Sequence, residues 1–178
     1  LNAALKPLRD RRVVIVEDAG GHPAEAEVLA RLGKLKAKTV LVNVVAATKP
    51  VALKAVKSIH DAKAGLVLAL GGDLAVSVAK LSRLLAADRK ADLAALALPF
   101  LSEAKRIATL PTAVLPLAVV QTTAWARECV SQGLFYSDRA GIHRIVDSWP
   151  LYTSCAADEV CCLYPCARRP LRRKSDFA

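Results

Sequence analysis

Gly71 and Gly72 stand between a run of apolar residues and a helical pattern, in the segment GLVLALGGDLAVSVAK that covers residues 65–80. A strand, a glycine turn and a helix in this order are how a nucleotide-binding fold presents the N-terminus of a helix to a phosphate group. Asp73 follows the pair, where an anion-binding loop favours a third glycine, and its carboxylate repels phosphate. The alternative is a tight turn that needs glycine for its backbone geometry, with Asp73 capping the helix.

The cysteines and histidines do not predict a metal site. A zinc site favours the spacing C-x2–4-C, and the adjacent Cys161 and Cys162 with Cys166 fit it poorly. Free thiols are the expectation, and a disulfide stays open for an oxidising compartment. The histidines lie far apart and suit surface or helix-end positions. They are His22, His60 and His143.

Alternating strand and helix patterns must position these residues. Short apolar or β-branched runs predict strands, and segments with one apolar face, two of which open at a proline, predict helices. This alternation predicts an α/β fold with a doubly wound, mostly parallel sheet of the Rossmann-like kind. The predicted strands are 13–16, 39–45 and 65–70, and the predicted helices are 23–34, 50–62 and 74–86.

The pattern weakens toward the C-terminus. We expect a helix over 91–104 that is broken at Pro99, then a fourth strand over 106–110, with weaker strand patterns at 117–120 and 134–136. Beyond residue 146 no period holds, and prolines suggest irregular chain. The expected organisation is therefore a lead-in (1–12), an α/β domain (13–146) and an irregular C-terminal extension (147–178) with a basic tail.

The composition favours a core of small aliphatic side chains. Hydrophobic residues make up 54% of the chain and aromatic residues only 4%, which suits a parallel sheet covered by helices on both faces. No apolar run approaches the ~20 residues that span a bilayer. The formal net charge is +10, and part of it lies in the tail. The tail cations are Arg168, Arg169, Arg172, Arg173 and Lys174.

These residues are compatible with two interpretations of the C-terminal region. The tail fits a solvated, flexible end, and it also fits an arm that binds an acidic protein, RNA or an anionic lipid surface. Trp149 and Tyr152 lie where no regular element is predicted to bury them, so we favour contacts with a partner protein. The chain begins with Leu1 and contains no Met, from which we expect a removed targeting segment and a mitochondrial location.

From Arg12 to about Pro116 the chain resembles the N-terminal domain of the iron-containing alcohol dehydrogenase family, whose superfamily includes dehydroquinate synthase and glycerol dehydrogenase. Three segments carry the resemblance. VIVEDAG (14–20) is similar to the first strand and "TDPG" turn of that family, and LALGG (68–72) with Ala79-Lys80 is similar to its "GGGSxxDxAK" loop and helix. IATLPT (107–112) is similar to its "IAIPTT" strand and turn.

The resemblance implies a cofactor site and also its erosion. It implies that Asp18 contacts the cofactor ribose, and that Gly71, Gly72, Pro111 and Thr112 belong to the cofactor-binding turns. At the family's polar positions this chain has other residues, namely Asp73, Leu74, Ser77, Ala113 and the segment LPLAV (115–119). The family's metal ligands belong to a helical C-terminal domain, and the chain ends before such a domain.

These observations lead to two functional hypotheses. The first is a pseudoenzyme that binds no cofactor and serves as an accessory subunit of a larger assembly, such as a mitochondrial respiratory or ATP-synthase complex. The second is an NAD(P)-binding domain of an alcohol-dehydrogenase-like oxidoreductase. The eroded loop favours the first, and the surviving glycine pair with Asp18 favours the second.

Overall fold

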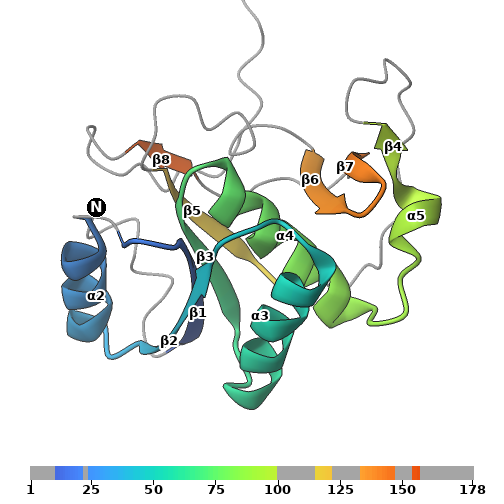
Figure 1. The fold of residues 1–178 in the computed structure, drawn as a ribbon. Coiled ribbons are helices and arrows are strands. Elements are labelled where there is room, and N and C mark those ends of the chain that lie inside the picture. The colour runs from blue at the N-terminus through green and yellow to red at the C-terminus, as the bar shows by residue number, and fades with distance from the viewer. Residues whose placement is uncertain (1–10, 22–23, 100–114, 122–132, 147–153, 157–178) are drawn as a thin grey trace, which may run out of the picture.

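The computed structural model describes residues 11–21, 24–99, 115–121, 133–146 and 154–156. Its main sheet has five strands in the order β2-β1-β3-β5-β8, and every neighbouring pair is parallel (Figure 1). The doubly wound, parallel α/β fold predicted from the sequence is therefore confirmed. The strands are β1 (Arg12–Asp18), β2 (Lys38–Val44), β3 (Leu66–Gly71), β5 (Leu117–Gln121) and β8 (Ser154–Ala156).

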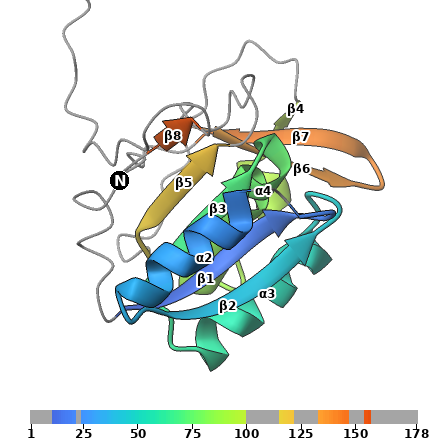
Figure 2. The same cartoon turned by 90° about the vertical axis from the view of Figure 1, so that its left-hand side faces the viewer.

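Helices cover both faces of this sheet. One face packs against α2 (Ala24–Lys34), and the other packs against α3 (Lys49–Asp61) and α4 (Asp73–Ala87) (Figures 1 and 2). Proline in the first turn of α3 suits a helix start, since the missing N–H would have no partner inside the helix. The expected helices at 23–34, 50–62 and 74–86 thus form, with ends shifted by a residue.

The alternation of side chains along the strands divides the core into two clusters. Val14 and Val16 of β1 pack with α3 and α4, whereas Val13 and Ile15 pack with Val28 and Leu32 in the other cluster, beneath α2. Helix α4 is the most enclosed element among the described ones, because every residue from Ala75 to Leu85 is buried. A helix that is buried all round must have protein on several sides.

A second, antiparallel sheet lies against α4. It has the order β4-β7-β6 and comprises β4 (Leu98–Pro99), β6 (Gly133–Asp138) and β7 (Gly141–Val146). The weak strand pattern at 134–136 is thus real, but it belongs to a hairpin apart from the main sheet. The Ser137 amide donates to the Ala47 carbonyl at 2.6 Å, and the Tyr136 hydroxyl donates to the Leu93 carbonyl at 3.3 Å.

The helix predicted over 91–104 is wrong in its described part. Only a short helix, α5 (Leu93–Leu96), forms there, and Asp92 caps it by accepting from the amides of Ala94 and Ala95. The backbone then becomes extended at Ala97 and enters β4. Pro99 accounts for the extended backbone at Leu98, because a proline disfavours the helical conformation of the residue before it.

Several expectations fall outside the described residues. They are the strand over 106–110 with Pro111 and Thr112, the aromatic residues Trp149 and Tyr152, and the cations Arg168, Arg169, Arg172, Arg173 and Lys174. Within the extension expected to be irregular, residues 154–156 form strand β8 beside β5. Among the described helices, none has both the length and the apolar character that a bilayer-crossing segment needs.

Replacing Leu81 with alanine tests the central role of α4. Leu81 is fully buried between the sheet and the neighbouring helix, so Leu81→Ala should lower the free energy of unfolding by about 2–5 kcal/mol. Leu53→Ala on α3 is the matched control, because Leu53 is 39% exposed, and it should cost less than about 1 kcal/mol. Urea unfolding followed by circular dichroism measures both. Equal losses for the two variants would contradict this packing.

The β6–β7 hairpin contains a hydrogen bond between a histidine and an aspartate that can be tested by titration. His143 Nε2 lies 2.8 Å from Asp138 Oδ1, and this hydrogen bond, with that of the Ala140 amide, lowers the pKa of Asp138 below 3.8. The carboxylate therefore contributes stability above pH 3.8, and this contribution is lost as the pH falls through the lowered pKa.

His143→Ala should raise the pKa of Asp138 toward its ordinary value, as measured by carbon NMR of the carboxyl group. The control His60→Ala removes a histidine from α3 and should leave the Asp138 titration unchanged. If the Asp138 titration were the same in His143→Ala and in the unchanged chain, the hydrogen bond would not be the cause of the lowered pKa.

Candidate functional site

The topology of the main sheet identifies where a ligand site would lie. The chain leaves β1 through α2 to reach β2 on one side, and it leaves β3 through α4 toward β5 on the other side. Strands β1 and β3 are neighbours, so the strand order reverses between their carboxyl ends. In open α/β sheets, ligands bind in the crevice at such a switch point. Asp18 ends β1, and Gly71 ends β3.

A hydrogen bond joins the two sides of the switch point. The Gly72 amide donates to Asp18 Oδ2 at 2.7 Å, in a partly buried position. Gly72 is the N-cap residue of α4, so the carboxylate lies at the positive end of the helix dipole. The other oxygen, Asp18 Oδ1, is buried and has no hydrogen-bond partner among the described residues. The sequence predicted a cofactor role for each residue but not this contact between them.

Position 71 requires glycine, because its backbone has a positive φ and its neighbours leave no room for a Cβ atom. Its φ of +149° is a conformation that residues with a side chain rarely adopt. A Cβ atom at this position would lie 2.5 Å from Asp18 Oδ2 and 2.9 Å from the Cβ of Ala75. The space above Gly71 is therefore filled by the carboxylate and by the first turn of α4.

The start of α4 differs from the alternative that the sequence suggested. Gly72 occupies the N-cap position with an extended backbone, so Asp73 is the first helical residue and not the cap. A carboxylate in the first turn still interacts favourably with the helix dipole. Asp18 and Asp73 thus place two acidic residues at one helix start.

Ser77 stands where the loop motif that this segment resembles has an acidic residue. Its side chain is fully buried, and its hydroxyl accepts a hydrogen bond from the amide of Phe135 at 3.4 Å. This contact ties α4 to β6 of the second sheet. Sequence reasoning noted the replacement but had no signal for the contact, because Phe135 lies 58 residues away along the chain.

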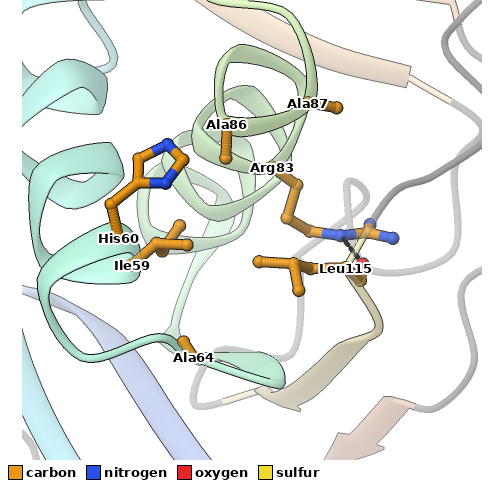
Figure 3. A pocket seen from close by; sticks show the side chains of 7 residues that line it. All are labelled: Ile59, His60, Ala64, Arg83, Ala86, Ala87 and Leu115. Carbon is orange, nitrogen blue, oxygen red and sulfur yellow. Dashed lines mark hydrogen bonds between the residues drawn. The ribbon is translucent and has the colours of Figure 1, made fainter.

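A pocket of about 250 Å³ opens at the opposite edge of the sheet (Figure 3). It lies between the C-terminal ends of α3 and α4, and Leu115 precedes β5 on its floor. The buried Arg83 side chain crosses this region, and its Nε donates to the Leu115 carbonyl at 2.5 Å (Figure 3). Helix C-termini carry partial negative charge, and His60 and the cationic Arg83 also line this pocket. Among the described residues, no group of three or more histidine, cysteine or acidic side chains is arranged to hold a metal ion.

Several solved structures have a fold similar to that of this chain. The chain is similar to a 1,3-propanediol oxidoreductase, with a TM-score of 0.69 and 16% identity over 83% of this chain and 38% of the other. It is also similar to the iron-containing alcohol dehydrogenase of Thermococcus thioreducens, with a TM-score of 0.67 and 14% identity over 82% of this chain and 39% of that one.

A further similar structure is the sulfoacetaldehyde reductase of Bifidobacterium kashiwanohense in complex with NAD+, with a TM-score of 0.64 and 17% identity over 83% of this chain and 38% of the enzyme. No protein-family model and no curated protein matches the sequence. The chain spans less than two fifths of the length of these three proteins. At this identity the likeness shows the fold alone: the chain has an alcohol-dehydrogenase-like, Rossmann-like α/β fold.

The residues at the switch point do not fit the diphosphate of the NAD(P) that the resemblance implies. A phosphate bound at a helix N-terminus needs free amide donors and room beside the glycine turn. Here the Gly72 amide donates to Asp18, and a Cβ atom on Gly71 would already collide with the same carboxylate. We therefore derive no reaction step through a bound dinucleotide. The ribose contact implied for Asp18 stays a prediction.

Gly71→Ala tests the contact between the turn and Asp18. Backbone strain and the collision with Asp18 should together lower the free energy of unfolding by about 3 kcal/mol. Gly33→Ala is the matched control, since Gly33 lies in α2 with nothing within 4 Å of the added Cβ, and it should be neutral or stabilising.

The double variant of Gly71→Ala and Asp18→Ala measures how strongly the two residues depend on one another. Asp18→Ala removes one of the two groups that collide with the new Cβ, so the double variant should lose less stability than the sum of the single variants, by about 1 kcal/mol. Urea unfolding of all variants gives this coupling. Strict additivity would mean that Gly71 and Asp18 do not constrain one another.

Proposed function

We propose that this chain is a non-catalytic protein with an alcohol-dehydrogenase-like fold that serves as an accessory component of a larger protein assembly. The observation that supports this proposal is that polar groups at the switch point and inside α4 form hydrogen bonds with other groups of the same chain. Asp18 holds the Gly72 amide, and the Ser77 hydroxyl holds the Phe135 amide. Both contacts stay within the chain and stabilise its own fold.

The chemical argument follows from what a working site requires. A catalytic or cofactor site keeps preorganised donors directed at the ligand, and they act because no internal acceptor competes for them. At this switch point the amide that begins α4 already has a charged acceptor. The position that is acidic in the family's loop motif instead supports the packing of α4 against the second sheet.

Exposed apolar side chains at one edge of the sheet are consistent with contacts to other proteins. Val40 and Leu41 of the edge strand β2 are 38% and 40% exposed, and Val45 just beyond the strand is 74% exposed. An edge strand has backbone groups directed away from its sheet and is a surface on which another chain can pair. A binding role uses this surface without requiring a reaction.

The second candidate function is the NAD(P)-binding domain of an alcohol-dehydrogenase-like oxidoreductase. The observation that favours it is the position of the glycine turn, which lies at the switch point in front of the N-terminus of α4. The likeness in fold to a reductase solved with NAD+ adds to it.

Titration of the purified chain with NADH and with NADPH separates the two candidates. Under our proposal, neither nucleotide changes the melting temperature or shows a change in fluorescence on binding. A bound nucleotide at about 100 times its dissociation constant would instead add about 2.7 kcal/mol of stability. Such a saturable response would contradict the proposal and favour the oxidoreductase.

The accessory role itself is tested by isolating the tagged chain from its native source under gentle conditions. We expect it to elute with a defined set of partner proteins at a mass well above that of one chain. Recovery of the free monomer alone would contradict a role in an assembly.

A further inference from the structure

We infer that the Asp18 carboxylate occupies the anion-binding position at the N-terminus of α4 and thereby excludes diphosphate ligands from the Gly71–Gly72 turn. This inference deepens the proposed function and rests on it, because it names the group that closes the site. It assigns a specificity role to one carboxylate. It also explains why a glycine pair at a switch point need not bind a nucleotide.

The position of the carboxylate is the first argument. Strands β1 and β3 are paired in parallel with Glu17 opposite Leu70, so Asp18 follows directly beside the start of the glycine turn. Its Oδ2 lies 2.7 Å from the amide nitrogen of Gly72, which is hydrogen-bonding distance. A phosphate oxygen that used this amide would have to occupy the same point, so the two anions compete for one donor.

The space around Gly71 is the second argument. In a dinucleotide-binding turn, a glycine lets the backbone approach the diphosphate, because no side chain stands between them. A Cβ atom on Gly71 would meet Asp18 Oδ2 at 2.5 Å and Asp18 Cγ at 2.8 Å. The room that the glycine leaves is therefore taken by a side chain of the same protein.

Charge is the third argument. Asp18 Oδ1 is buried and has no hydrogen-bond partner among the described residues, while Oδ2 accepts from the Gly72 amide. Asp73 adds a second acidic residue in the first turn of α4. A diphosphate that approaches this helix start meets the like charge of Asp18, whose Oδ1 is buried, and Coulomb repulsion is stronger at a buried atom than in bulk water.

Binding of inorganic pyrophosphate, measured by isothermal titration calorimetry, tests the inference. The full-length chain is compared with Asp18→Ala, which removes both the charge and the bulk, and with Asp18→Asn, which removes the charge but keeps an acceptor for the Gly72 amide. Asp61→Asn is the matched control, because Asp61 is an exposed carboxylate at the end of α3 and has the same charge change.

We expect no saturable binding by the unchanged chain or by Asp61→Asn. Asp18→Ala should bind pyrophosphate saturably, with an affinity at least about tenfold above the detection limit that the unchanged chain does not reach, which corresponds to ~1.4 kcal/mol, and Asp18→Asn should show a smaller gain. Asp18→Asn keeps the hydrogen bond that holds the turn, so it supplies a folded variant even if Asp18→Ala unfolds. Circular dichroism and a cooperative urea transition confirm the folded state of each variant.

Two results would overturn the inference, and they differ from the result that would overturn the proposed function. Folded Asp18 variants that bind pyrophosphate no better than Asp61→Asn would show that Asp18 does not close the site. Pyrophosphate binding by the unchanged chain as tight as that by Asp18→Ala would show the same. The proposed function fails instead if the unchanged chain binds NADH or NADPH, or if it is recovered from its source only as a free monomer.

Discussion

The hydrogen bond between Asp18 and the Gly72 amide is the constraint on which the centre of this molecule depends. It joins the end of β1 to the start of α4 across the switch point of the sheet. The contact requires a residue without a side chain at Gly71, because any Cβ there would collide with the carboxylate. It also places a negative charge at the positive end of a long helix, which favours this arrangement electrostatically.

Helix α4 connects the turn at Gly72 to the rest of the fold through its packing contacts. Its residues from Ala75 to Leu85 are all buried, since the helix lies between the main sheet, α3 and the second sheet. A hydrogen bond of Ser77 connects α4 to β6, and a hydrogen bond of Arg83 connects the last turns of α4 to the segment before β5. A displacement of the turn at Gly71 would therefore disturb the packing of both sheets, which gives a structural reason to keep the turn when no ligand is bound.

The functional conclusion follows from this use of polar groups more than from the fold. In open α/β sheets a ligand binds at the switch point where this turn lies, but a fold does not determine a function. In this chain the amide of the turn and the hydroxyl inside α4 have acceptors and donors from the same protein. The fold can thus be stable with the Asp18 carboxylate occupying the space beside the glycine turn.

Most of the α/β architecture could be predicted from the sequence, because its signals are local. The apolar strands, the helix starts near Pro23 and Pro50 and the glycine turn all follow from neighbouring residues, and they correctly indicated the doubly wound sheet. The helix predicted over 91–104 failed where Pro99 imposed an extended backbone. The motif likeness also identified Asp18, Gly71 and Gly72 as residues of one region.

By itself, the sequence determined the alternation of strands and helices from β1 to α4 and the residue types at the switch point. Only the tertiary structure decided that Asp18 lies against Gly72, that Ser77 holds Phe135 and that the hairpin of β6 and β7 packs on α4. These pairs are 54 and 58 residues apart, and no local period couples residues at such separations. Asp18 meets Gly72 because the parallel strands β1 and β3 align their carboxyl ends. Ser77 meets Phe135 because the second, antiparallel sheet packs on α4.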